Sequence, residues 1–388
     1  MTQTSYRKSG KAKPAVYFHQ VLVSRDLGGA GIVALRLAQF FHAQNQPSYV
    51  WVPGTGSSKD RAQALNLTCH EYYGVRLFQS SKVALVIENV KIGRLLRRQS
   101  PGILHVHSPF YYKALQLGLM ISGLKSVAHV QIEEGEEGLR WAFQNPPNVI
   151  ITCAQFLVDH VRRALPEQYQ IKQKIIAIPN AVDTEQFYPK NKEVAKDRIG
   201  APRGIPLALI VANLAPHKGQ ETAMRAIAIL KQTGINVALW IVGGEREQKE
   251  IYTTYLSSLS RELEVDDRVR LLGYREDIPA LLQAADFFLL PSEHEGLPLA
   301  ILEAQATKVV VLAAPTAGIP EVVIDRETGF LVAAKNASGY ADCLSNLLLD
   351  PSLYQRIVEK AYAKIVEEYN WKSYCEKVKG VYEQLLCD

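Results

Sequence analysis

The chain reads A-D-F-F-L-L-P-S-E-H-E-G-L-P-L-A-I-L-E-A from Ala285 to Ala304. The apolar run over 285–291 is typical of a buried parallel strand, and the residues after the prolines carry apolar side chains at helical spacing. The stretch is therefore predicted to be a strand, a loop and a helix in succession.

The start of this helix is predicted to bind an anion. Pro298 suits the first helical turn, because its ring presets φ and its missing N–H costs nothing there. We expect the free amides of Gly296, Leu297, Leu299 and Ala300 to point out of the helix start, together with the positive end of the helix dipole. Such a place most often holds a phosphate.

Two carboxylates flank the predicted anion site. Glu295 lies in the loop before the helix, and Glu303 is expected about two turns into it. A carboxylate accepts two hydrogen bonds side by side, which suits a vicinal sugar diol, and each such bond contributes about 1.5–3 kcal/mol when water is excluded. The stretch can therefore hold a phosphate and a sugar together.

Length and composition indicate a soluble protein of two ordinary domains. The chain has 388 residues, of which 47% are apolar, and no stretch approaches the roughly 18 consecutive apolar residues of a membrane span. Residues 1–14 are polar and basic and are predicted to form a disordered tail. The five cysteines are scattered without a Cys-x-x-Cys pair, which indicates free thiols in a reducing cytoplasm.

Only the first half of the chain is basic. Residues 1–190 contain 22 Lys and Arg against 12 Asp and Glu, a net charge of +10, and the remainder has a net charge of −5. A basic half can bind nucleic acid, an anionic membrane surface or an acidic substrate. No zinc-finger, RNP-type or helix-turn-helix pattern accompanies the charge, so we expect no nucleic-acid partner.

Strand and helix patterns alternate along both halves, which predicts an α/β fold with two Rossmann-like, doubly wound parallel sheets. A charged segment rich in Pro and Gly, 188–206, is predicted to be the linker. The expected parts are an N-terminal domain over 15–188, a C-terminal domain over 189–370, and a last helix, 371–388, that crosses back to the N-terminal domain. Strands are expected over 15–23, 48–52, 102–107, 126–131, 149–153, 174–178, 207–212, 237–242, 269–272, 285–291, 309–313 and 329–332.

A glycine-rich loop containing Gly28 and Gly29 follows the first predicted strand and opens a helix. Residues 29–34 formally match the dinucleotide fingerprint, which would indicate a dehydrogenase. That fingerprint needs an acidic residue at the end of the second strand to bind the ribose diol. The second strand ends in Pro-Gly-Thr-Gly over 53–56, so nicotinamide binding is not favoured.

The predicted helix over 82–98 has an apolar face interrupted by Lys91, Arg94, Arg97 and Arg98. One interpretation is a helix packed on the core with a solvated basic face. The other is a helix on an anionic membrane surface, which needs an apolar face with a basic edge.

Histidines lie at the carboxyl ends of two strands of the first half. Alternation places His105 and His107 on one side of their strand, but no third ligand with suitable spacing follows them, so no metal site is predicted. His129 and Gln131 end the next strand, and an acidic loop that includes Glu133 comes after them. This loop is either a solvated loop or a contact for acceptor hydroxyls.

Several ordered motifs resemble those of retaining glycosyltransferase family 4, whose members have the GT-B fold of two Rossmann-like domains facing across a cleft. Glu295 and Glu303 match the Glu-x-seven-Glu motif of that family. The match covers nearly all of the second half and separate points of the first. The other matching pieces are V-A-N-L over 211–214, H-K-G over 217–219, G-G over 243–244, L-G-Y over 272–274, A-G-I-P-E-V over 317–322, T-G over 328–329, G-G over 28–29 and P-N-A-V-D over 179–183.

The resemblance implies roles for residues in both halves. It implies that Glu303 binds the ribose diol of a nucleotide sugar, that Glu295 binds the transferred sugar near its C3 hydroxyl, and that Lys218 neutralises the leaving diphosphate. His129 is implied as a further catalytic residue. The implied donor-binding residues are Glu303, Asn213, Gly28, Gly29, Gly296, Leu297, Leu299, Ala300, Gly243, Leu272 and Tyr274, and the implied acceptor-binding residues are His107, Gln131 and Glu133.

The chain departs from the family pattern at two positions. Asn213 stands where the family usually has an Arg that clamps the diphosphate with the Lys. The family also commonly has a His where this chain has Gln131, two residues after His129. Either residue could make the first-domain contact with the sugar, and the alternative for His129 is a satisfied core histidine.

The resemblance implies a hexosyltransferase that takes its donor from a nucleoside diphosphate sugar, with UDP favoured and GDP or ADP as alternatives. No Asp-x-Asp motif is present, so we expect no metal and no cofactor. The expected acceptor is a glycan or a lipid-linked glycan of polysaccharide or lipopolysaccharide biosynthesis, reached at the inner face of the cytoplasmic membrane. Alternatives are a GT-B epimerase or hydrolase acting on the nucleotide sugar, and a non-catalytic nucleotide-sugar binding protein.

Overall fold

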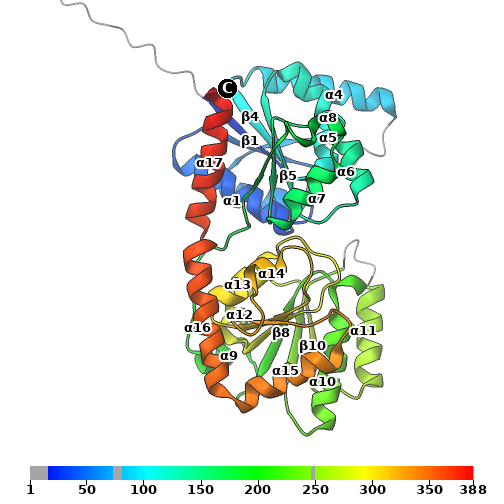
Figure 1. The fold of residues 1–388 in the computed structure, drawn as a ribbon, viewed down its shortest axis with the longest axis vertical. Helices are drawn as coiled ribbons and strands as arrows, with labels where there is room; N and C mark the ends of the chain where they lie inside the picture. Colours follow the sequence, from blue (N-terminus) through cyan, green and yellow to red (C-terminus); the bar gives the residue numbers. More distant parts are fainter. Residues whose placement is uncertain (1–15, 73–80, 246–249, 388) are drawn as a thin grey trace, which may run out of the picture. The chain divides into compact units, whose positions relative to one another are not determined.

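The computed structural model describes residues 16–72, 81–245 and 250–387. The predicted tail, 1–14, lies outside these residues. The chain divides into two compact units, which are described separately below (Figure 1). Unit 1 comprises Met1–His129, Asn145–Val149 and Tyr382–Asp388, and unit 2 comprises Val130–Gln144 and Ile150–Val381.

The first sheet has seven strands in the order β3-β2-β1-β4-β5-β6-β7, so the strand order reverses between β1 and β4. The short strand β3 was not predicted, because its sequence, T-C-H-E, has no run of apolar residues. The bounds are β1 Tyr17–Val21, β2 Ser48–Val52, β3 Thr68–Glu71, β4 Gly102–Val106, β5 Lys125–Val130, β6 Val149–Thr152 and β7 Lys174–Ala177.

The second sheet has six strands in the order β10-β9-β8-β11-β12-β13, all paired in parallel. The bounds are β8 Leu207–Val211, β9 Ala238–Val242, β10 Val269–Gly273, β11 Phe287–Leu290, β12 Val310–Ala313 and β13 Phe330–Leu331. Together the two sheets confirm the predicted α/β class with two doubly wound parallel sheets.

Helices connect the strands, as parallel pairing requires. In the first half they are α1 Gly29–Ala43, α2 Ser57–Ala64, α4 Lys82–Arg97, α5 Pro109–Ser122, α6 Glu136–Ala142, α7 Phe156–Ala164 and α8 Glu167–Gln170. In the second half they are α9 Lys192–Ile199, the 3₁₀ helix η1 Pro216–Lys218, α10 Gln220–Gln232, α11 Ile251–Glu262, α12 Ile278–Ala284, α13 Leu299–Ala306, α14 Ile319–Val322, α15 Ala337–Leu349, α16 Pro351–Glu368 and α17 Trp371–Cys387.

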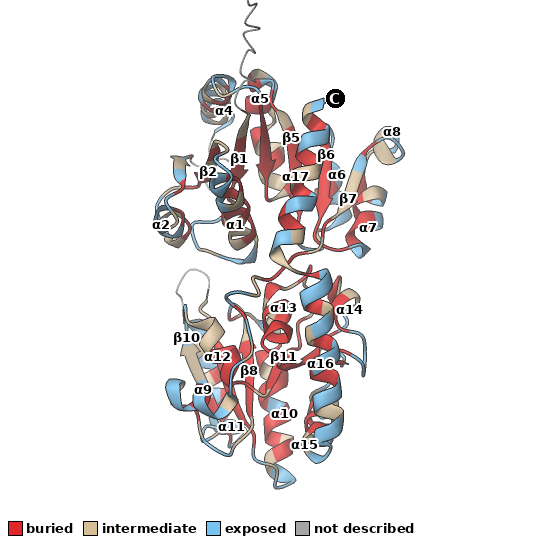
Figure 2. Cartoon of the chain, turned by 90° about the vertical axis from the view of Figure 1, so that its left-hand side faces the viewer, coloured by how far each residue is buried: buried red, intermediate tan, exposed pale blue. Residues whose placement is uncertain are grey.

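The central strands are buried on both faces, as Figure 2 shows by colour. In β11, Phe287 and Leu289 belong to the core on one face of the sheet, and their neighbours Phe288 and Leu290 are buried as well. A strand covered on both faces reads as a continuous apolar run rather than an alternating one. This explains why the run over 285–291 predicted β11 correctly.

The predicted linker over 188–206 is not a free connector, because it contains α9. The helix is anchored by charge: Lys196 Nζ lies 3.0 Å from Asp286, just before β11, and Lys192 Nζ lies 3.4 Å from the same carboxylate. The side chain of Asn191 caps the helix by accepting a hydrogen bond from the amide of Val194. The sequence pattern missed α9 because this helix has few apolar residues to show a period.

The end of α17 belongs to unit 1. Tyr382 packs against both Phe18 of β1 and Phe41 of α1, with ring centroids 5.3 Å from each. Its hydroxyl accepts a hydrogen bond from Gln20 Nε2 at 3.0 Å. The domain boundaries predicted from the sequence remain a prediction.

Candidate active site

The loop and helix that follow β11 form as predicted, with small shifts. Pro298 is the N-cap residue rather than a first-turn residue, with φ of −66°, and α13 begins at Leu299. Glu303 therefore lies in the second turn of α13, nearer to its start than expected, and its side chain is buried. Within the described part of the chain, no side chain caps this helix start, so the amides of Leu299 and Ala300 keep their capacity to bind a ligand.

Lys218 and Glu295 form an ion pair, with Nζ 2.7 Å from Oε1. The pair depends on Gly219, which ends η1 with a left-handed φ of 75°. A Cβ at that position would lie 2.1 Å from the carbonyl oxygen of Pro291. Only glycine therefore lets η1 approach the end of β11 closely enough to place the lysine beside the glutamate.

The residues after β5 in unit 2 lie against the same loop. Ile132 and Gly296 form an antiparallel bridge, and the amide of Glu133 donates to the carbonyl of Glu295 at 3.4 Å. A Cβ at Gly296 would lie only 1.9 Å from the carbonyl oxygen of Gln131. The structure thus places Gln131 and Glu133, two predicted acceptor residues, next to Glu295.

Sequence reasoning missed the surroundings of Leu297. Its backbone hydrogen-bonds the thiol of Cys153, whose pKa burial raises to about 12, and its carbonyl accepts a hydrogen bond from Asn180 Nδ2 at 2.8 Å. The backbone of Leu297 is therefore already engaged within the protein. The Pro-Asn pair at 179–180 was the only sequence signal for this contact.

The other predicted donor residues of unit 2 lie at the carboxyl ends of neighbouring strands, the edge where open parallel sheets bind ligands. Asn213 follows β8 and is exposed. The amide of Gly243, after β9, donates to the carbonyl of Gly273 at 2.9 Å. This bond joins the end of β9 to Gly273 of β10, whose neighbours in the chain are Leu272 and the exposed Tyr274.

The remaining predicted residues lie in unit 1. Gly28 is the N-cap of α1, with open space around the position of an added Cβ, and Gly29 is the first residue of that helix. His107 and His129 are 3% and 0% exposed, and burial lowers the pKa of His129 to about 3. Direct contact of either imidazole with an acceptor or a sugar stays a prediction.

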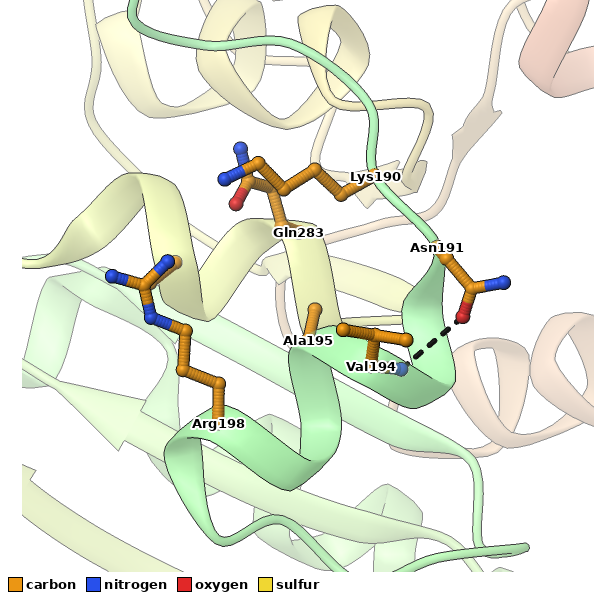
Figure 3. A pocket seen from close by; sticks show the side chains of 7 residues that line it. Lys190, Asn191, Val194, Ala195, Arg198 and Gln283 are labelled. Atoms are coloured by element: carbon orange, nitrogen blue, oxygen red, sulfur yellow. Dashed lines mark hydrogen bonds between the residues drawn. The ribbon is translucent and has the colours of Figure 1, made fainter.

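A separate cavity of about 220 Å³ lies between α9 and α12 (Figure 3). None of its lining residues belongs to the predicted site. They are Lys190, Asn191, Val194, Ala195, Arg198, Ala280 and Gln283.

Two family models match this chain: Glycosyltransferase Family 4 over residues 27–186, and Glycosyl transferases group 1 over residues 191–364. The chain is 30% identical over 253 residues to the D-inositol 3-phosphate glycosyltransferase of Corynebacterium aurimucosum, a match that covers 60% of this chain and 59% of that protein. It is 26% identical over 309 residues to the UDP-Gal:alpha-D-GlcNAc-diphosphoundecaprenol alpha-1,3-galactosyltransferase of Escherichia coli, covering 76% and 79% respectively.

The fold is shared with Anabaena Alr3699/HepE, solved in complex with UDP-glucose. The two structures superpose with a TM-score of 0.82 at 18% identity, over 95% of this chain and 99% of that one. The two family models together span most of the sequence, which confirms the predicted resemblance. The chain therefore belongs to glycosyltransferase family 4 and has the GT-B fold of its enzymes.

Proposed function

We propose that this protein is a retaining hexosyltransferase that moves a hexose from a nucleoside diphosphate sugar to a glycan or lipid-linked acceptor. The observation that carries the proposal is the Lys218–Glu295 ion pair at the start of α13. A diphosphate and a hexose need opposite groups, a cation for the phosphates and a carboxylate for the sugar hydroxyls. This pair offers both within one contact.

In the proposed reaction, the donor separates the pair. Lys218 Nζ exchanges the carboxylate of Glu295 for a phosphate oxygen, and Glu295 becomes free to accept a hydrogen bond from a hydroxyl of the hexose. Negative charge then builds on the leaving diphosphate, where Lys218 and the first-turn amides of Leu299 and Ala300 stabilise it without a metal. Glu303 accepts the hydrogen bonds of the ribose diol.

The proposed substitution takes place on one face of the sugar. The acceptor hydroxyl attacks the anomeric carbon from the side on which the phosphate leaves, so a carbon–oxygen bond to the acceptor forms as the bond to the phosphate breaks. The leaving phosphate oxygen takes the proton of the acceptor hydroxyl. The products are the glycosylated acceptor, with its anomeric configuration retained, and a nucleoside diphosphate.

The donor is tested by thermal unfolding with UDP-, GDP- and ADP-sugars, because a ligand of the native state stabilises it by about 2.7 kcal/mol at 100 times its Kd. We propose a UDP-sugar, supported by the UDP-sugars named for the Escherichia coli and Anabaena proteins. Release of free nucleotide without an acceptor would instead identify a hydrolase or epimerase. Binding without turnover across a broad acceptor panel would identify a non-catalytic binding protein.

We also propose that α4 places the enzyme on an anionic membrane, at the cytoplasmic face, where a lipid-linked acceptor lies. Val83, Val86 and Ile87 are 69%, 50% and 51% exposed, and Arg94 and Arg97 lie in the last turn of the same helix. Exposed apolar side chains beside basic ones fit an anionic lipid surface. No helix among the described residues is long and apolar enough to cross a membrane.

The membrane contact is tested by sedimentation with vesicles of phosphatidylglycerol and with vesicles of phosphatidylcholine alone. The wild type is expected to sediment with the anionic vesicles, and Ile87→Glu is expected to lose this binding. Val194→Glu, which places the same charge on an exposed side chain of α9, is the matched control. Equal sedimentation of all three proteins would contradict a contact through α4.

A further inference from the structure

Three imidazoles come together at the carboxyl ends of β4 and β5 in unit 1. His105 lies in β4, His107 directly follows it, and His129 lies in β5. All three are buried, and one ring nitrogen from each lies within 4.8 Å of the other two. The third imidazole, which sequence spacing did not reveal, is supplied by the neighbouring strand.

Several of these ring nitrogens have no protein partner. Among the described residues, both nitrogens of His129 and Nε2 of His105 are buried without a hydrogen bond. Buried polar atoms are almost always paired, since leaving them unpaired costs free energy. His129 is fully buried and meets the other two imidazoles with nitrogens that lack a partner among the described residues, so a ligand bound between the rings would satisfy them.

The outer nitrogens of the other two imidazoles do have partners. His107 Nε2 lies 2.9 Å from Gln20 Oε1, which can only accept a hydrogen bond. His105 Nδ1 lies 2.7 Å from the hydroxyl of Tyr382, and the tautomer of the imidazole decides which of the two donates the hydrogen bond. In metal sites, a ligating histidine typically donates its other N–H to such an acceptor, and the contact of His107 with Gln20 matches that pattern.

We propose that His105, His107 and His129 bind one divalent transition-metal ion of the zinc class. Three atoms at most 4.8 Å apart always have a common point no more than about 2.8 Å from each of them, and a zinc–imidazole bond is about 2.0–2.1 Å. In distance alone, each nitrogen is therefore within about 1 Å of a bonding position. The rings of His105 and His107 are stacked, with centroids 4.3 Å apart, so binding requires both rings to turn about χ2, and their hydrogen bonds to Gln20 and Tyr382 have to re-form in the turned position.

The donor set determines which ions fit. Three imidazole nitrogens suit Zn²⁺, Co²⁺ or Ni²⁺, whereas Mg²⁺ and Ca²⁺ prefer carboxylate and carbonyl oxygens. Three protein ligands leave a fourth tetrahedral position for a water. The ion joins β4 to β5 directly and, through Tyr382, the end of α17, so it is expected to stabilise unit 1.

The test uses the full chain without a histidine tag, titrated with Co²⁺ and followed by visible absorption, with Zn²⁺ as a competitor. We expect one Co²⁺ per chain with the intense bands of tetrahedral coordination, displacement by Zn²⁺, and a higher Tm with either ion. His129→Gln is expected to weaken binding at least tenfold. His42→Gln, which removes an exposed imidazole from the last turn of α1, is expected to bind as the wild type does.

Two results would overturn the proposal: a wild type that binds no Co²⁺, and a His129→Gln variant that binds it as tightly as the wild type. If His129→Gln does not fold, as judged by circular dichroism, the spectrum of the wild type decides. Weak bands of octahedral Co²⁺ would then assign the ion to surface groups and refute the buried site.

Discussion

The carboxyl ends of the two sheets carry different kinds of polar groups. After β11 in unit 2, charged side chains pair with opposite charges: Lys218 with Glu295 at 2.7 Å, and Lys335 with Glu293 at 2.8 Å. After β4 and β5 in unit 1, the polar groups are buried imidazoles, some without a partner. The first arrangement can exchange its partners for a charged substrate, whereas the second offers buried ring nitrogens that a small ion could bind.

The largest effect is expected from Lys218→Ala, which removes the proposed cation of the exchangeable pair. The diphosphate would lose its charged partner, and loss of one such electrostatic donor typically lowers kcat by about 100- to 1,000-fold. Steady-state transfer of the hexose, measured with the donor found by thermal shift, checks this expectation. Circular dichroism should show that the fold is intact.

The matched control is Lys335→Ala, because Lys335 pairs with a glutamate of the same loop, two residues before Glu295. Its side chain is far more exposed than that of Lys218, and we expect activity close to that of the wild type. Equal losses in the two variants would show that the loop, rather than the Lys218–Glu295 pair, is what matters. Wild-type activity in Lys218→Ala would refute the proposed site.

Glu303→Gln is expected to raise KM for the donor by about tenfold or more, since a hydrogen bond to a charged group contributes about 1.5–3 kcal/mol. The change keeps the shape of the buried side chain in α13, so the fold should persist. A donor that lacks the ribose 2′-hydroxyl provides the second arm of a cycle. The wild type should bind this donor more weakly than the normal donor, whereas Glu303→Gln should bind the two donors almost equally. If removing the hydroxyl weakens binding as much in the variant as in the wild type, Glu303 does not contact the ribose.

Gly296→Ala should destabilise the protein, because its Cβ would lie 1.9 Å from the carbonyl oxygen of Gln131. Overpacking of this kind costs about 3 kcal/mol, near the upper end of the usual range. Gly28→Ala is the matched control in unit 1, where an added Cβ meets nothing within 4 Å. Urea unfolding should separate the two variants, and equal midpoints would show that the contact at Gly296 relaxes freely.

Local sequence patterns predicted most of the fold, and the exceptions have physical reasons. The apolar run of β11 was sufficient because this strand is buried on both faces. By contrast, α9 is anchored through Lys192 and Lys196 on Asp286, which leaves no hydrophobic period in the sequence. Apolar spacing reveals elements that bury a hydrophobic face, and it does not reveal a helix that is held in place by ion pairs.

The site was predictable only where it is local. Glu295 and Glu303 lie in one strand–loop–helix segment, so a short motif identifies them. The close approach of Gly296 to Gln131 joins distant segments, and no spacing encodes it. The sequence did not reveal the third imidazole for the same reason. The register of β4 and β5 pairs His105 with Val127, and continuing this register places His107 level with His129.

The smallest effect is expected for a substitution of His19, which lies on the face of the first sheet opposite to the three imidazoles. His19 neighbours Gln20 in β1, so alternation directs it away from the three imidazoles. Its pKa is lowered to about 3, mainly by burial and then by His70, while its Nδ1 accepts a hydrogen bond from Trp51 Nε1 at 3.1 Å. The folded state therefore resists a proton that the unfolded chain takes up near pH 6.5.

The stability that this neutral imidazole contributes is complete above about pH 6.5 and is lost as the pH falls towards 3. The expected slope is about 1.4 kcal/mol per pH unit, or about 2 kcal/mol at pH 5. His19→Leu should be less stable at pH 7, because Trp51 loses its acceptor, yet its stability should fall less steeply between pH 7 and pH 5 in urea unfolding. His42→Leu, at an exposed position, should keep the pH dependence of stability of the wild type. If His19→Leu also keeps it, the proton taken up on unfolding binds to a group other than His19.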